Sequence, residues 1–150
     1  MIPSFIEKEA RVYTIIVEFT KNPNDVRNEG LADYFIDEEG YERVIVYCKD
    51  DTQQSINYAY ACMLHELTEL RLCEIRGIKE PDIDKFDAWH LENNLDGEPG
   101  DNKESPYRKE HRSAEMVERY FIEQCGVHWD DYNTTYVIPD GFHYDVKYGK

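Results

Sequence analysis

The sequence predicts an α+β protein in which a small N-terminal antiparallel sheet packs on three helices. Three observations support this fold class. Short runs rich in β-branched and aromatic residues occur within residues 12–48, and residues 53–76 contain neither proline nor glycine. Two later segments each open with a proline, as helices often do. We expect all 150 residues to form one domain, residues 1–150, that buries its own core.

The first fifty residues contain three predicted strands. Residues 12–19 (VYTIIVEF) are too short and too rich in β-branched residues for a typical helix. Residues 32–36 and 41–48 are separated by a turn that ends in Gly40, which is the pattern of a β-hairpin. Alternate residues of the second run fall on opposite faces, as the period of a strand requires. A further short run, residues 136–138, is expected to add an edge strand.

Three helices are predicted after these strands. The first begins after residues 50–52, any of which can cap a helix, and it stops at Gly77. This long central helix carries an HExxE motif. The second helix opens at Pro81. Residues 105–106, Ser-Pro, supply an N-cap and a first-turn proline for the third helix, which ends at Gly126.

The composition argues against several classes of protein. The formal charge of −15 disfavours direct binding to nucleic acid or to anionic lipid. Hydrophobic residues at 41% and aromatic residues at 13% are too abundant for a disordered acidic chain. No run approaches the ~18 apolar residues of a membrane span, and the start lacks a signal-peptide pattern, so we expect a cytoplasmic protein. The four cysteines form no CxxC pair and are expected to be reduced, mostly buried thiols.

The long predicted helix contains His65, Glu66 and Glu69. At about 100° per residue, Glu69 lies roughly 40° from His65, whereas Glu66 lies roughly 100° away. A histidine and a carboxylate one turn apart can both reach one divalent ion, and the intervening glutamate can face a bound water, as in the HExxH helix of zinc peptidases. The stripe that carries His65 is otherwise largely apolar. Buried charges need partners or a metal, so this stripe indicates a site.

Two other interpretations of this stripe stay open, a buried His–Glu hydrogen bond without metal and a solvated helix face. The third predicted helix offers His111 with Glu115 and Glu118 on one stripe, and the second adds Asp87 and Glu92. Two helices that each carry a histidine and an inward glutamate favour a shared metal site. Ordinary surface or hydrogen-bonded histidines are expected at His90, His128 and His143.

Six short motifs succeed one another along the chain. They are LHELTELRLCEIRGI (64–78), DKFD (84–87) with Glu92, EPGD (98–101), SPY (105–107), HRSAEMVE (111–118) and GVHWDDY (126–132). In this order they resemble a widespread family of uncharacterised phage and bacterial proteins. The family pattern is approximately HElvEalLC, FDxxFE, EPGD, aPY, HxxAxxiE and GVdWxxY, and the resemblance covers residues 34–132.

This resemblance implies a zincin-like, metal-binding helix pair but brings no established activity. The positions that match its metal-binding residues are His65, Glu69, His111 and Glu118. The family's FDxxFE occurs here one residue longer, as FDAWHLE, so Asp87 matches the pattern better than Glu92. The family shows no fixed acid at the position of Glu115, which favours Glu118 as the second acidic residue of its helix.

These residues predict a zinc-dependent hydrolase, peptidase-like, that acts on a peptide or small-molecule substrate. Zinc held by the two histidines and Glu69 would lower the pKa of a bound water toward about 7. Glu66 would act as the general base. Asp87 or Glu118 would hold the second ring nitrogen of a ligand histidine, and Glu92 is expected beside them.

Two other kinds of function stay open. Several inward carboxylates could hold Mg²⁺ or Mn²⁺ and hydrolyse a nucleotide pyrophosphate, although two histidines favour zinc over magnesium, whose sites are nearly all oxygen. The protein could instead be non-catalytic. It would then be an acidic mimic of DNA that blocks a DNA-binding protein, or a phage structural protein whose metal only holds helices together.

Overall fold

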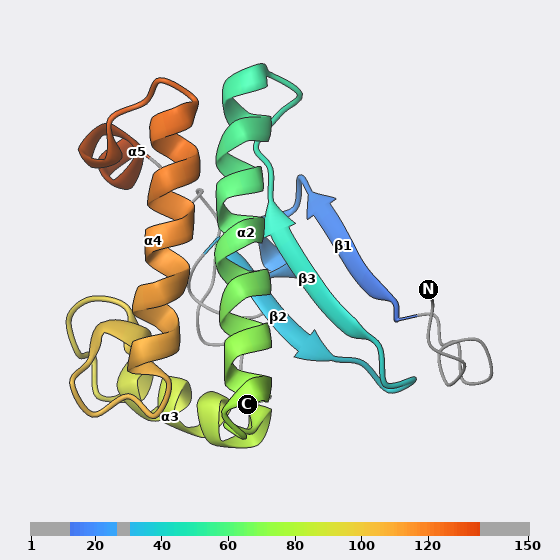
Figure 1. Cartoon of the computed structure of the whole chain (residues 1–150), viewed down its shortest axis with the longest axis vertical. Coiled ribbons are helices and arrows are strands. Elements are labelled where there is room, and N and C mark those ends of the chain that lie inside the picture. Colours follow the sequence, from blue (N-terminus) through green and yellow to red (C-terminus); the bar gives the residue numbers. More distant parts are fainter. Residues whose placement is uncertain (1–12, 27–30, 136–150) are drawn as a thin grey trace, which may run out of the picture.

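A computed structural model describes residues 13–26 and 31–135 of the chain. In this part a three-stranded sheet packs against a set of helices, which confirms the predicted α+β class and the long central helix (Figure 1). The strands are β1 (Ile15–Thr20), β2 (Ala32–Ile36) and β3 (Glu42–Tyr47). The α-helices are α2 (Gln53–Ile75), α3 (Glu80–Glu92), α4 (Arg108–Gln124) and α5 (Trp129–Thr135). Two short 3-10 helices are η1 (Pro23–Asp25) and η2 (Pro99–Asp101).

The sheet has the order β1-β3-β2, so β3 is its central strand. Strands β2 and β3 form the predicted antiparallel hairpin, and Gly40 takes a φ of 87° in its turn. Strand β1 pairs with β3 in parallel, however, so the prediction of an antiparallel sheet is right for the hairpin and wrong for β1. A strand's hydrophobic pattern is the same in either direction, so it does not encode the direction of pairing.

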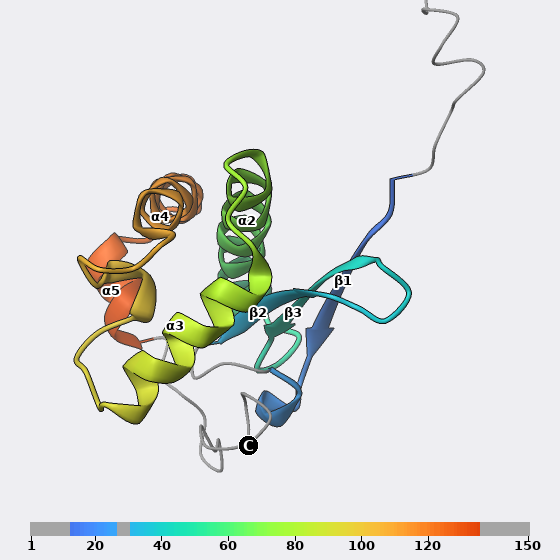
Figure 2. The same cartoon turned by 90° about the horizontal axis from the view of Figure 1, so that it is seen from below.

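Helix α2 lies across one face of this sheet (Figures 1 and 2). The residues of β3 alternate between buried and half-buried, as predicted, and Val44 and Val46 join the buried core together with Tyr58 and Ala59 of α2. All four cysteines are free, and three of them are buried. None of the described helices combines the length and the apolar composition that crossing a membrane requires.

The ends of the helices agree with the predicted signals in part. The hydroxyl of Thr52 caps α2 by accepting a hydrogen bond from the amide of Ser55, and Gly77 comes after the helix with a φ of 71°. Helix α4 begins at Arg108, later than predicted. Ser105 does not cap the helix, because it forms a turn with Pro106 and Tyr107, and Tyr107 takes the N-cap position. The main chain of Ser105 accepts from the Arg108 amide, and its side chain accepts from the Tyr107 amide.

Helix α5 is not among the three helices that the sequence predicts. Asp130 and Asp131 stand in its first turn, where acidic side chains favour a helix. Its Tyr132 is buried and packs against Tyr58 of α2, with ring centroids 5.0 Å apart. The tertiary contact, which a local pattern does not reveal, stabilises this short helix. The predicted edge strand at residues 136–138 lies outside the described residues.

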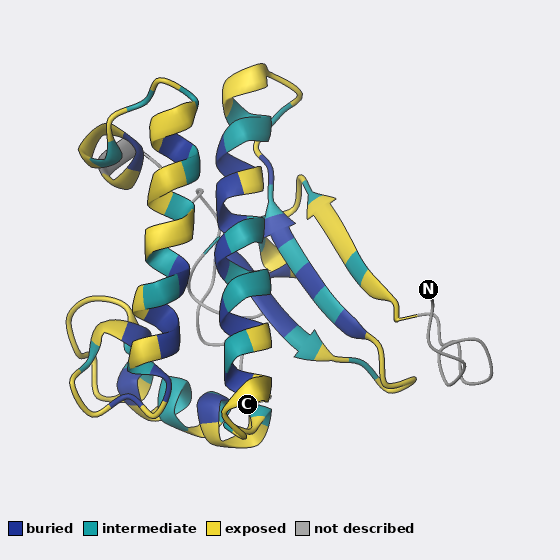
Figure 3. Ribbon diagram, viewed as in Figure 1, coloured by how far each residue is buried: buried dark blue, intermediate teal, exposed yellow. Residues whose placement is uncertain are grey.

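Helices α2 and α4 run side by side, and the faces that they turn toward each other are buried (Figure 3). The two helices are therefore adjacent, as a shared metal site between them requires. The buried residues between them are mostly apolar, but they include His65, Glu69 and His111.

Candidate metal centre

His65 and Glu69 of α2 meet His111 of α4 in the buried space between the two helices. These residues are at most 8% exposed. The Nε2 atom of His65 lies 3.2 Å from Oε2 of Glu69, and Nδ1 of His111 lies 2.9 Å from the same oxygen. The two ring nitrogens are 3.2 Å apart. Three potential ligand atoms thus form a small triangle.

This triangle fits a divalent transition metal. Ligands about 2.0–2.2 Å from a tetrahedral zinc lie roughly 3.3–3.6 Å from one another. The three atoms are 2.9–3.2 Å apart, so a few tenths of an ångström of side-chain movement would open the triangle around an ion. Two imidazoles and one carboxylate are a ligand set that zinc prefers and that magnesium does not.

Hydrogen bonds among the side chains of the cluster shift the pKa values of its members. Burial raises the pKa of Glu69, but hydrogen bonds from His111 and His65 outweigh it and lower that pKa to about 2. Burial lowers the pKa of His111, but hydrogen bonds to Glu69 and Glu98 outweigh it and raise that pKa to about 10. Hydrogen bonds to Glu118 and Glu69 likewise overcome burial and raise the pKa of His65. Without a bound metal, charged hydrogen bonds between the protonated imidazoles and the ionised Glu69 therefore stabilise the cluster.

Glu118 contacts His65 from the side opposite to Glu69. Its Oε1 lies 2.8 Å from Nδ1 of His65, the nitrogen that faces away from the triangle. The hydroxyl of Tyr132, on α5, donates a 2.5 Å hydrogen bond to the other carboxylate oxygen. The position of Glu118 thus differs from the prediction that it is a metal ligand. Glu118 instead takes the other role that we predicted for it, that of an acid that holds the second ring nitrogen of a ligand histidine.

Carboxylates also lie at the second ring nitrogen of His111, as Glu118 does at that of His65. Its Nε2 lies 3.2 Å from Oε2 of Glu98 and 3.4 Å from Oδ1 of Asp101, both in the segment around η2. These three residues form a second group compact enough to hold a cation. We did not predict Glu98 and Asp101 as site residues, although the EPGD motif that contains them was a signal that could have identified them.

The glycine of this motif explains why η2 can approach so closely. Gly100 is buried, and a Cβ atom on it would lie 2.4 Å from Cγ of the His111 ring. A contact under 3.0 Å is not possible without movement. The sequence therefore places a residue without a side chain against the imidazole, which lets the neighbouring Glu98 and Asp101 reach its Nε2 atom.

Glu66, the predicted general base, is half-buried beside the cluster and forms no hydrogen bond or ion pair with the described residues. Burial raises its pKa, and the negative charges of Glu69 and Asp33 raise it further, while His65 and His111 lower it. Glu66 is therefore within electrostatic range of all three potential ligands without being one of them. Asp33, on β2, is a buried acid that no sequence pattern singled out.

Asp87 and Glu92 do not contact the two histidines. Asp87 accepts a 2.6 Å hydrogen bond from the hydroxyl of Tyr107, whose ring centroid lies 6.2 Å from that of His111. Asp87 is thus linked to the centre through one intervening side chain. Glu92 is exposed at the end of α3.

His90 differs from the prediction that it is a surface or hydrogen-bonded residue. It is 1% exposed, and neither ring nitrogen has a hydrogen-bond partner among the described residues. It stands near the end of α3, where the one-turn spacing from Phe86 turns it inward, and the two ring centroids are 6.4 Å apart. His128 is exposed, as predicted, and His143 lies outside the described residues.

A comparison of the chain with models of known protein families, with curated proteins and with solved structures found no significant match. Its function is therefore argued from the geometry of the site.

Proposed function

We propose that the protein is a zinc-dependent hydrolase, peptidase-like in its chemistry. The observation that carries the proposal is the buried triangle of His65, Glu69 and His111. Catalytic zinc sites use three protein ligands and leave a fourth position for water or substrate, whereas structural sites use four. Glu118 does not complete this group as a fourth ligand, because it contacts the far side of the His65 ring.

The carboxylates behind the histidines support this proposal. Glu118 would accept the Nδ1 proton of His65, and Glu98 with Asp101 would accept the Nε2 proton of His111. Such contacts fix which nitrogen is free for a metal and increase its basicity, and they are the usual surroundings of ligand histidines.

The chain's own residues would then divide the chemistry between them. His65, Glu69 and His111 would hold a zinc ion, which would supply Lewis acidity and lower the pKa of a water molecule toward about 7. Glu66 would take the proton of that water as it attacks a carbonyl carbon, and would return it to the leaving group. Its freedom from any hydrogen bond to the described residues suits a group that must accept and release a proton.

A purely structural zinc site is the second candidate, and the burial of the cluster favours it. Glu69 and His111 are each 5% exposed, which limits the space through which a substrate could approach. The two candidates share the three residues of the triangle, and they differ in whether the fourth position stays open to water and in the role of Glu66.

The first test measures metal content. We expect about one zinc ion per chain by inductively coupled plasma mass spectrometry, and loss of that ion in His65→Ala or His111→Ala. His128→Ala is the matched control and should keep its zinc, because His128 is exposed and lies outside the centre. Circular dichroism would show whether each variant still folds. A folded wild-type protein that takes up no transition metal after incubation with zinc would contradict the proposal.

The second test separates catalysis from structure through Glu66→Gln. We expect zinc content and folding to be unchanged while turnover falls by about 10² to 10⁴, the usual contribution of a general base. Wild type and variant would be assayed on a peptide library and on a panel of nucleotides, with zinc or with manganese. Equal activity in both proteins would remove Glu66 from the mechanism. Activity in neither panel, with zinc bound, would favour the structural site.

A further inference from the structure

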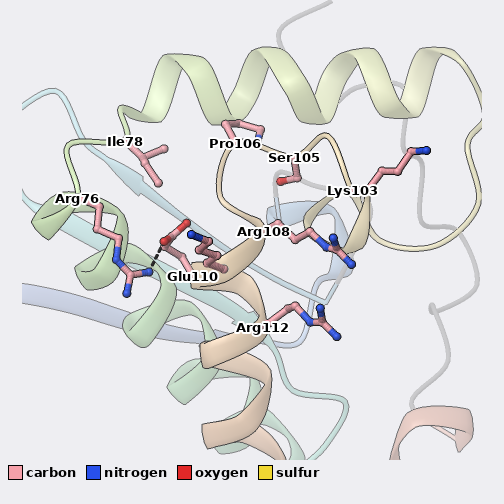
Figure 4. A pocket seen from close by; sticks show the side chains of 9 residues that line it. Arg76, Ile78, Lys103, Ser105, Pro106, Arg108, Glu110 and Arg112 are labelled. Carbon is pink, nitrogen blue, oxygen red and sulfur yellow. Dashed lines mark hydrogen bonds and ion pairs between the residues drawn. The ribbon is translucent and has the colours of Figure 1, made fainter.

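A basic pocket of about 700 Å³ lies where the end of α2 meets the start of α4 (Figure 4). One wall comes from residues just after α2, and the other comes from the loop and first turn of α4. The charged residues that line it are Arg76, Lys103, Arg108, Lys109, Glu110 and Arg112. None of the metal-centre residues lines this pocket, so a ligand site here is independent of the proposed function.

The charge of this pocket is opposite to that of the whole chain. The protein carries a formal charge of −15 with only 17 basic residues, yet five of those 17 line this one pocket. The pocket contains a single carboxylate, that of the buried Glu110, and Arg76 already pairs with it. Four cations remain without an ion pair to any described residue, namely Lys103, Arg108, Lys109 and Arg112.

The start of helix α4 carries donors that could bind an anion. The Nε atom of Arg108 is buried and has no hydrogen-bond partner among the described residues, a costly state for a charged donor unless something binds there. Helix α4 starts beside it without a side-chain cap, because Tyr107 occupies the N-cap position. The amides of a helix's first turn are donors that favour an anion.

The direction of the side chains agrees with a common ligand. Arg108 and Arg112 are one turn apart on α4 and extend the same way, and Lys103 lies on the loop above them with its side chain directed outward (Figure 4). Guanidinium groups form paired hydrogen bonds with the oxygens of phosphate and carboxylate groups, and the several cations of this pocket favour the higher charge of a phosphate over a singly charged carboxylate or chloride. The negative field of the rest of the chain would repel a long polyanion such as nucleic acid, which leaves a small anion as the occupant.

We propose that this pocket binds a phosphate group, either as inorganic phosphate or as the phosphoryl group of a small molecule. Arg108 and Arg112 donate hydrogen bonds to its oxygens, and Lys103 and Lys109 balance the remaining negative charge.

The test is isothermal titration calorimetry of the full chain with inorganic phosphate at constant ionic strength. We expect saturable binding at one site, weakened on the order of 10-fold or more by Arg108→Gln or Arg112→Gln, since each removes a charged hydrogen bond. Arg71→Gln is the matched control. It removes one positive charge from an exposed position on α2 outside the pocket, and it should change the affinity less than about two-fold.

Further measurements complete the test. Arg112 is exposed, so its variant should fold even if Arg108→Gln does not, and circular dichroism would establish both. Titration with a phosphomonoester and with pyrophosphate distinguishes the sources, because a phosphoryl ligand should bind more tightly than free phosphate. Absence of saturable phosphate binding would overturn the proposal. So would equal weakening in Arg71→Gln and Arg112→Gln, which would show attraction to overall charge only.

Discussion

Gly100 is the residue on which the contact between η2 and His111 depends. A Cβ atom there would meet the imidazole at 2.4 Å, and a ring fixed between two acidic groups has little room to retreat. Gly100→Ala should therefore destabilise the protein by about 1–3 kcal/mol, the usual cost of overpacking. It should also weaken zinc binding, because it displaces His111 or the carboxylates behind it.

A glycine from the same loop provides the control for this prediction. Gly97 has a φ of 76° and open space around its Cα, so Gly97→Ala meets only the backbone cost of about 1 kcal/mol. Its zinc affinity should equal that of the wild type. Denaturant unfolding and competition with a zinc chelator would measure both quantities. If Gly100→Ala kept wild-type zinc affinity, the close approach of η2 would have no role in the centre.

At the scale of the elements, the centre depends on helix α5 as well as on α2 and α4. Tyr132 of α5 donates a hydrogen bond to Glu118, and its hydroxyl is 3.2 Å from Sγ of Cys62 on α2. The short helix thus positions the carboxylate that holds His65. Loss of such a supporting contact typically costs about 10- to 100-fold in metal affinity.

Tyr132→Phe should therefore weaken zinc binding by about 10-fold while it keeps the ring that packs against Tyr58. Tyr120→Phe is the matched control, because Tyr120 is 66% exposed on α4 and lies outside the centre. Zinc affinity of both variants can be read from competition with a fluorescent chelator. A Tyr132→Phe variant with unchanged affinity would show that Glu118 holds His65 without help from α5.

The sequence predicted the elements whose signals are local. Thr52 and Gly77 mark the ends of α2, and the one-turn spacing of His65 and Glu69 on that helix predicted their shared face. What it did not predict depends on contacts between distant segments. The carboxylates of η2 reach His111 only because the loop folds back over α4, and α5 is stabilised by the packing of Tyr132 on α2. The direction of β1 is likewise set by the topology of the sheet.

The whole molecule carries a strong net negative charge, yet some of its buried acidic side chains are protonated and therefore neutral. Asp87 is such an acid: burial raises its pKa to about 8, although its hydrogen bond from Tyr107 lowers it. The ordinary pKa of an aspartate, about 3.9, applies in the unfolded chain. Asp87 is therefore protonated in the folded state over a range in which it is ionised in the unfolded state.

The sign of the pH effect comes from this difference. Between about pH 4 and pH 8 the folded state binds the extra proton, so the free energy of unfolding falls as the pH rises through this range. Asp87→Asn stays neutral at every pH and should show a flatter dependence between about pH 5 and pH 8. Urea unfolding of the metal-free proteins across this range would measure it. Parallel profiles for the two proteins would show that Asp87 ionises normally in the folded chain.

Strand β1 joins the sheet beside β3 although β2 lies between them in the sequence. The hairpin closes a loop of a few residues, whereas the β1–β3 pair must bring together segments more than twenty residues apart, at a greater entropic cost. We therefore expect the hairpin to form early in folding and β1 to add late. Because β1 adds last, we expect it to be the first strand to detach when the folded protein opens locally. Its departure would uncover the edge of β3, a template for pairing with another chain, so aggregation would begin there.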